Sequence, residues 1–175
     1  MGPCHFKMHR NYQSFLRVND NKTELNQLVA SEVNNMDCPQ GTLIVSTRGA
    51  QVLCSSDLES IDMIMPCDHE EADTRTMLHA AHMKQQGTDS VVVRTNDTDV
   101  LILATYTQAL LGFNEFWLSF GVGRSHKFIP VHDIVLQIGR SAALALIGFH
   151  AFTGCDPIPS IRNKGKKTCS DLWQK

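Results

Sequence analysis

Hydrophobic and polar residues follow helical spacing in two long segments of the chain. Residues 21–33 carry an apolar stripe on one helical face, and Asn21 suits the N-cap position. Residues 70–86 are rich in Ala, Met, Leu and Glu, begin with acidic residues and stop at Gly87. Acidic residues favour a helix start and glycine favours a helix end, so both segments predict helices. The stripe of the first helix consists of Leu25, Leu28, Val29 and Val33.

Shorter apolar runs predict strands. Residues 42–46 and 51–54 flank the turn sequence 47–50 and predict a hairpin. Residues 90–95 form a continuous apolar run, which is typical of a strand buried on both faces. The other predicted elements are strands over 116–120 and 127–130, a turn over 121–125, and helices over 100–111, 133–139 and 142–152. Because helices follow a buried strand, the pattern predicts an α/β domain with a mostly parallel sheet.

Composition places the chain among intracellular globular proteins. Its 175 residues suit one core-bearing domain, and 42% hydrophobic with 19% charged residues is ordinary for a folded protein. The six cysteines form no CxxC pair, which indicates reduced thiols. The first ten residues lack the apolar core of a signal peptide, and no apolar run approaches the ~20 residues of a spanning helix. We therefore expect a soluble intracellular protein without a membrane partner, compatible with the nucleus.

Acidic residues cluster where an α/β sheet forms its sites. Asp97 and Asp99 follow the predicted strand 90–95, and sites form at the carboxyl ends of such strands. In an extended segment residues two apart point the same way, so these two carboxylates are expected to aim at one point. Glu71 and Asp73 begin the helix over 70–86.

The geometry at that helix start leaves two pairings open. Glu71 and Asp73 are two apart and would lie on different faces of a regular helix, so they converge only if the first turn is irregular or Glu71 sits at the cap. Glu70 with Asp73, three apart, is the competing pair. Asp156 supplies a third acidic point after a predicted helix end.

Converging carboxylates repel unless a cation intervenes. Sites built from oxygen ligands suit Mg²⁺ or Mn²⁺ rather than zinc, and two such ions ~4 Å apart can stabilise phosphodiester hydrolysis. The same residues have a simpler interpretation, however. Acids are favoured in the first turn of any helix, and Asp-Thr-Asp is common turn chemistry.

Three separated motifs carry a resemblance to a known family. The segments 71–73 (EAD), 95–101 (TNDTDVL) and 153–156 (TGCD) resemble the internal region of flap-endonuclease-type, PIN-like nucleases. The fuller signatures HEEADTR, RTNDTDVLILA and FHAFTGCD look like a group of uncharacterised proteins built on the same core. The segment 160–167 looks like the family's helix-hairpin-helix-like turn, and the similarity covers roughly 43–175.

The resemblance implies a three-layer PIN-like core with a mostly parallel central sheet over 41–156. An amino-terminal segment with one helix would occupy 1–40, and a basic turn with the start of a helix 157–175. It implies metal-dependent cleavage of nucleic acid, DNA in preference to RNA, with two Mg²⁺ or Mn²⁺ ions. The implied catalytic and metal-binding residues are Glu71, Asp73, Asp97, Asp99 and Asp156. The implied nucleic-acid-binding residues are Arg162, Lys164, Gly165, Lys166 and Lys167.

Physical reasoning supports the basic turn independently. The net charge is −2, so any contact with nucleic acid needs a local patch, and the turn holds the only dense group of cations in the sequence. A solvated, frayed C-terminal segment is the simpler interpretation of the same residues.

The chain also departs from the family pattern. The family places one or two further aspartates on amino-terminal strands, whereas here the only acid before the first helix is Asp20, which suits a helix-cap turn. The sequence therefore resembles an amino-terminally truncated core, and a strand without its partner would expose an edge prone to association. Two alternatives to a nuclease stay open: an inactive PIN-like domain that binds nucleic acid or protein, and a fragment without activity.

Histidine and cysteine residues suggest weaker alternatives. A zinc site from Cys67, His69 and the pair His79 and His82 lacks a second pair at finger-like spacing. Cys155 as a nucleophile would need an oriented base, and His150 lies five residues back on a predicted helix, poorly aimed for that role. His150 is better interpreted as a core-side or site-lining residue.

Overall fold

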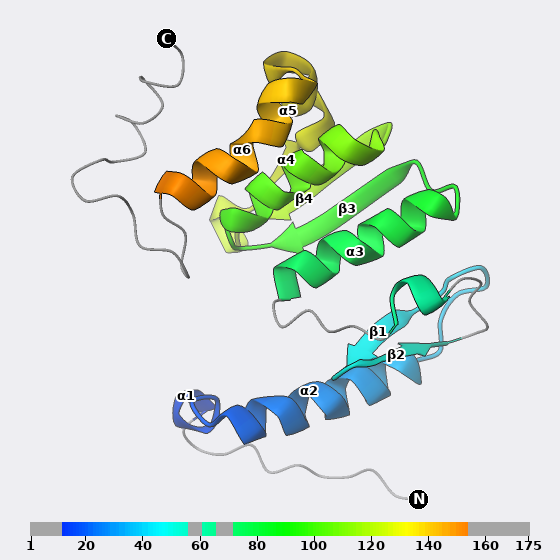
Figure 1. Ribbon diagram of the computed structural model, residues 1–175. Coiled ribbons are helices and arrows are strands. Elements are labelled where there is room, and N and C mark those ends of the chain that lie inside the picture. The colour runs from blue at the N-terminus through cyan, green and yellow to red at the C-terminus, as the bar shows by residue number, and fades with distance from the viewer. Residues whose placement is uncertain (1–11, 56–60, 66–71, 154–175) are drawn as a thin grey trace, which may run out of the picture. The chain divides into compact units, whose positions relative to one another are not determined.

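The computed structural model of the chain describes residues 12–55, 61–65 and 72–153 (Figure 1). The chain divides into two compact units, Met1–Asp68 and His69–Lys175, and each is described by itself. Both units combine helices with a small sheet, so the fold is of mixed α/β class, as predicted.

The first unit packs a helix against a hairpin. It contains α1 (Tyr12–Phe15), α2 (Asn19–Asn34), β1 (Val45–Arg48), β2 (Gln51–Cys54) and the short 3-10 helix η1 (Ile61–Met63). The predicted helix and hairpin are confirmed, although β1 begins later than predicted. Asp20 lies in the first turn of α2, as expected of a helix-cap turn. Ser46 Oγ donates a hydrogen bond to Ala30 O (3.1 Å) and ties the hairpin to α2.

The second unit alternates helices with strands, as the sequence pattern predicts. Its elements are α3 (Ala72–Gln85), β3 (Ser90–Thr95), α4 (Asp99–Leu111), β4 (Glu115–Phe120), the 3-10 helix η2 (Gly123–Ser125), β5 (Lys127–Pro130), α5 (Val131–Ile138) and α6 (Arg140–Thr153). In Figure 1, α3 and α4 lie against one face of the sheet and α6 packs beside α4.

The prediction of a mostly parallel sheet is wrong for the described residues, because the three-stranded sheet is mixed. The strand order is β3-β4-β5, with β3 and β4 parallel and β4 and β5 antiparallel. Parallel strands need a long crossover, which α4 supplies between β3 and β4. The turn from β4 to β5 is too short for a crossover, so β5 must run back along β4. Within the described residues β3 is an edge strand.

The prediction that β3 is buried on both faces is also wrong. Val91 and Val93 are each 6% exposed, whereas Val92 between them is 58% exposed. The buried pair lies with Phe116 and Leu118 of β4 in one core cluster, which residues of α3, α4 and α5 complete. The expected three-layer core is therefore not confirmed over the described residues, where Val92 stays open to solvent.

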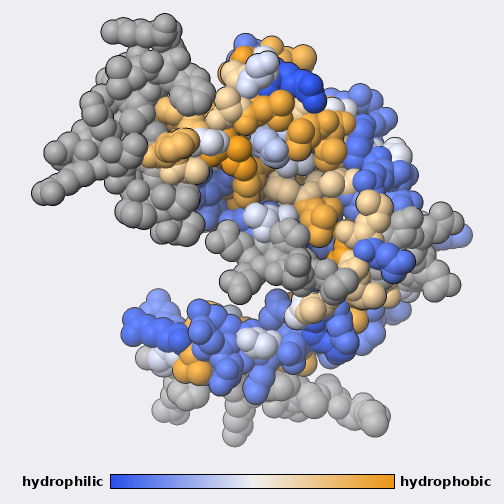
Figure 2. All heavy atoms as spheres, viewed as in Figure 1, coloured by the Kyte–Doolittle hydropathy of each residue, from blue (hydrophilic) through white to orange (hydrophobic). Residues whose placement is uncertain are grey.

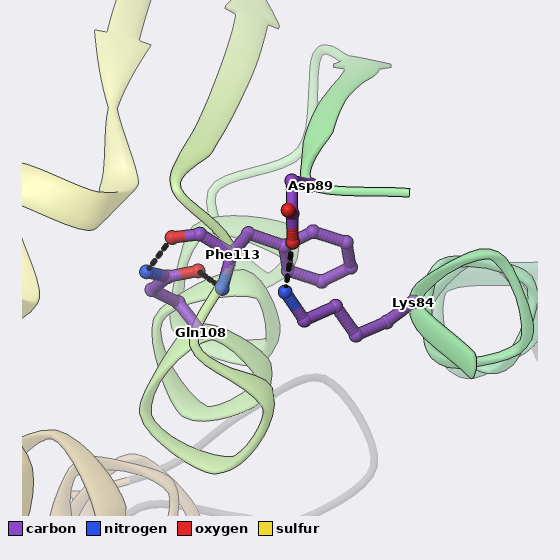
Figure 3. A network of polar contacts seen from close by, with 4 residues as sticks. All are labelled: Lys84, Asp89, Gln108 and Phe113. Carbon is purple, nitrogen blue, oxygen red and sulfur yellow. Dashed lines mark hydrogen bonds and ion pairs between the residues drawn. The ribbon is translucent and has the colours of Figure 1, made fainter. Parts of the chain in front are cut away.

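A network of contacts fixes the connection from α4 to β4 (Figure 3). Gly112 ends α4 in the left-handed conformation (φ 63°). The Gln108 side chain then donates from Nε2 to Phe113 O (2.9 Å) and accepts from Phe113 N–H (3.1 Å) through Oε1. Lys84 pairs with Asp89 and lies over the Phe113 ring, 5.3 Å from its centroid. These contacts hold the beginning of β4 beside β3.

Apolar residues also gather on the outside of the helical layer. Figure 2 shows them where α4, α5 and α6 meet on the viewed face. Among the described residues no single helix is long and apolar enough to cross a membrane. Only α5 and α6 taken together reach that length, and the chain bends by 103° between them.

Candidate functional site

The carboxyl end of β3 turns directly into α4. Thr95 ends the strand, and its Oγ1 accepts a hydrogen bond from the Asp97 backbone N–H (3.0 Å). Asp97 Oδ1 in turn accepts from the backbone N–H of Asp99 (2.8 Å), the first residue of α4. The Asp97 carboxylate therefore satisfies a helix-terminal N–H group, where negative charge is favoured.

The predicted geometry of the two aspartates is wrong. An extended segment would aim Asp97 and Asp99 the same way, but Asp99 already belongs to the helix. Both carboxylates nevertheless stay at the carboxyl end of β3, as predicted. Their Oδ1 atoms have protein partners, whereas neither Oδ2 atom forms a hydrogen bond or an ion pair within the described residues.

His150 joins the site from α6. Its Nε2 lies 3.2 Å from Asp99 Oδ1, and the two side chains are 14% and 32% exposed. The atoms meet at ion-pair distance without the alignment of a hydrogen bond. His150 is thus largely buried and lies beside the Asp99 carboxylate. Its partner was missed because Asp99 is far away in sequence and only the packing of α6 on α4 brings them together.

The turn after β4 closes onto the same edge. The backbone N–H of Gly121 donates to Thr95 O (3.3 Å). The Asn96 side-chain amide, with its nitrogen turned toward this loop, donates to Gly121 O (3.3 Å) and Thr95 O (3.2 Å). The ends of the two parallel strands are therefore joined beside Asp97.

The other predicted site residues are described only in part. Asp73 lies in the first turn of α3, is half-buried and has polar contacts of its own. Its predicted neighbours Glu71 and Asp156 lie outside the described residues. The same holds for the predicted nucleic-acid-binding residues Arg162, Lys164, Gly165, Lys166 and Lys167.

The histidines of the zinc alternative lie inside or near the core. His82 is 6% exposed, and His79 on the same helix is half-buried. Burial lowers the pKa of His79, and the neighbouring charges of Arg75 and His82 lower this pKa further. Cys67 and His69 lie outside the described part of the chain.

The described donors are of the kind that Mg²⁺ or Mn²⁺ prefers, but the set is incomplete. Asp97 and Asp99 offer hard carboxylate oxygens at one strand end. Over residues 12–55, 61–65 and 72–153, no three His, Cys, Asp or Glu side chains converge closely enough to hold a metal ion. A complete site would need carboxylates from the rest of the chain.

Comparison of the chain with protein-family models, with curated proteins and with solved structures finds no match in any of the three. The resemblance of the sequence motifs to flap-endonuclease-type nucleases therefore stays a prediction.

Proposed function

We propose that the chain is a PIN-like, divalent-metal-dependent nuclease domain that hydrolyses phosphodiester bonds in nucleic acid, DNA in preference to RNA. The observation that carries the proposal is the position of Asp97 and Asp99. Both lie where a parallel β3–β4 pair ends, which is where α/β sheets form their sites. The Oδ2 atom of each also forms no hydrogen bond or ion pair within the described residues.

In this proposal Asp97 and Asp99 hold the cations together with Asp73, Glu71 and Asp156. Bound Mg²⁺ or Mn²⁺ would supply an activated water and neutralise charge on the phosphodiester. The protein's own contribution is positional. The bond from Asp99 N–H fixes the Asp97 carboxylate, and His150 lies against the Asp99 carboxylate. The basic residues of 162–167 would hold the phosphate backbone.

One observation supports the alternative of a catalytically inactive PIN-like domain that binds nucleic acid or protein. The Oδ1 atom of Asp97 already serves the start of α4, and the Oδ1 atom of Asp99 already lies 3.2 Å from His150 Nε2. Acids with these structural roles would persist in a domain that holds no metal.

Metal binding tests the proposal. Thermal unfolding of the full chain would be followed with Mg²⁺, with Mn²⁺ and with a chelator. A cation that binds only the folded state at about 100 times its Kd stabilises by about 2.7 kcal/mol, or several degrees in Tm. Asp97→Asn should abolish this shift while keeping the Oδ1 acceptor that Asp99 N–H needs. Asp37→Asn, an exposed change in the other unit, is the matched control and should keep the shift.

Two results would overturn the proposal. The first is an unchanged Tm with either cation, and the second is a shift that Asp97→Asn leaves intact. Nucleic-acid binding that survives Asp97→Asn without any metal effect would favour the inactive domain.

A further inference from the structure

The strand register places three side chains in a row across the sheet. Arg94 of β3 pairs with Ser119 of β4, and Ser119 pairs with Phe128 of β5. Paired residues share a face, and the adjacent residues Val93 and Leu118 belong to the core. The row therefore lies on the opposite face of the sheet.

Polar and aromatic contacts support this row from β4 and β5. Arg94 Nη1 donates to Ser119 Oγ (3.3 Å), and Ser119 Oγ lies 2.8 Å from His126 Nε2. The His126 ring then meets the Phe128 ring edge to face, with centroids 5.0 Å apart. Phe128 stays 58% exposed although its ring packs against the His126 ring. A supported, exposed aromatic ring loses little entropy when a planar ligand stacks on it.

Positive charge gathers at the same end of the sheet. Arg94 lies next to the end of β3 and Arg124 lies in the turn from β4 to β5, and neither forms an ion pair within the described residues. Lys127 points to the opposite face, where its Nζ lies 5.8 Å from the centroid of the Phe120 ring. The acids of this edge over 94–99 and 119–127 are Asp97 and Asp99. Because the net charge of the chain is −2, contact with a polyanion at this edge depends on these two arginines.

We infer that this face binds single-stranded nucleic acid, with Arg94 and Arg124 on phosphates and a base stacked on Phe128. The inference rests on the proposed nuclease function, because Asp97 follows Arg94 by three residues, at most about 10 Å of extended chain. A strand held by Arg94 would thus pass beside the carboxylates. A duplex base is already stacked and cannot offer its face to Phe128, so the surface selects single strands.

Fluorescence anisotropy with a labelled single strand of about 12 nucleotides tests the surface, in chelator so that no cleavage occurs. Phe128→Leu should weaken binding roughly 5- to 100-fold, the usual effect of losing one stacked base, and Phe128→Trp should keep the affinity. Arg94→Gln with Arg124→Gln should lower the slope of log K against log salt by about 1.4. Arg17→Gln with Lys22→Gln removes two exposed charges from the other unit and should change neither quantity.

The outcomes separate this inference from the proposed function. If Phe128→Leu weakens single-strand and duplex binding equally, or weakens neither, the proposed stacking on Phe128 is rejected. This holds even if the cation-dependent shift in Tm is present. A weakened single-strand affinity without any metal shift supports the surface and rejects the nuclease. If the unaltered chain binds no single strand, the inference fails and the face is left to a protein partner.

Discussion

Gly121 has a backbone conformation that other residues avoid. Its φ is +85°, and an added Cβ would lie 2.8 Å from Ser125 O. Since backbone atoms cannot yield cheaply, we expect Gly121→Ala to lower the free energy of unfolding by about 1–3 kcal/mol in a urea titration. Gly123→Ala is the matched control, because its φ is +54° but nothing lies within 4 Å of its Cβ. It should cost about 1 kcal/mol, and equal losses would show that the clash does not matter.

His79 links stability to pH. Burial, and then Arg75 and His82, lower its pKa in the folded chain below the ordinary 6.5. The unfolded chain therefore binds this proton more readily, so the contribution of His79 is complete above about pH 6.5 and is lost as the pH falls. His79→Gln should flatten the decline of unfolding free energy between about pH 7.5 and about pH 5.5, measured by urea titration. Parallel declines in the two proteins would contradict the assignment.

At the scale of elements, the end of α4 depends on one buried side chain. Gln108 is 7% exposed and satisfies both the N–H and the C=O of Phe113, which is 3% exposed. Gln108→Leu would leave both groups without a partner, at about 1–3 kcal/mol for each. Gln137→Leu on α5 alters an exposed glutamine and should stay within about 0.5 kcal/mol. Comparable urea midpoints for the two variants would reject this role.

The elements themselves were largely predictable, whereas their faces were not. An apolar stripe predicts a helix such as α2, and β-branched residues predict the strand β3. The run Val91-Val92-Val93 reads the same whether one face or two are covered, so only packing shows Val92 exposed. The direction of β5 likewise depends on the length of the turn before it. That length can be read from the sequence, but the prediction of a parallel sheet did not use it.

At the scale of the whole molecule, the second unit contains its own core cluster among the described residues. Its buried members run from Met77 to Val131, all within His69–Lys175. We therefore expect His69–Lys175 expressed alone to unfold in one cooperative thermal transition, followed by circular dichroism. Phe116→Ala, which empties a fully buried position, should lower stability by about 3–5 kcal/mol in this segment and in the full chain alike. A broad transition, or a much smaller effect of Phe116→Ala, would show that the cluster does not organise the unit.

The sequence by itself determined which segments become helices and strands, because periodicity, caps and turn residues act over a few neighbouring positions. It also placed Asp97 and Asp99 at a strand end, where the structure has them. Glu71, Asp156 and the basic residues of 162–167 lie outside the described part and stay predictions. The bond from Asp99 N–H to Asp97 is local, whereas only the tertiary structure decided the contact of His150 with Asp99 and the row from Arg94 to Phe128. The last two join residues distant in sequence, and such pairings arise from packing and strand register rather than from any local pattern.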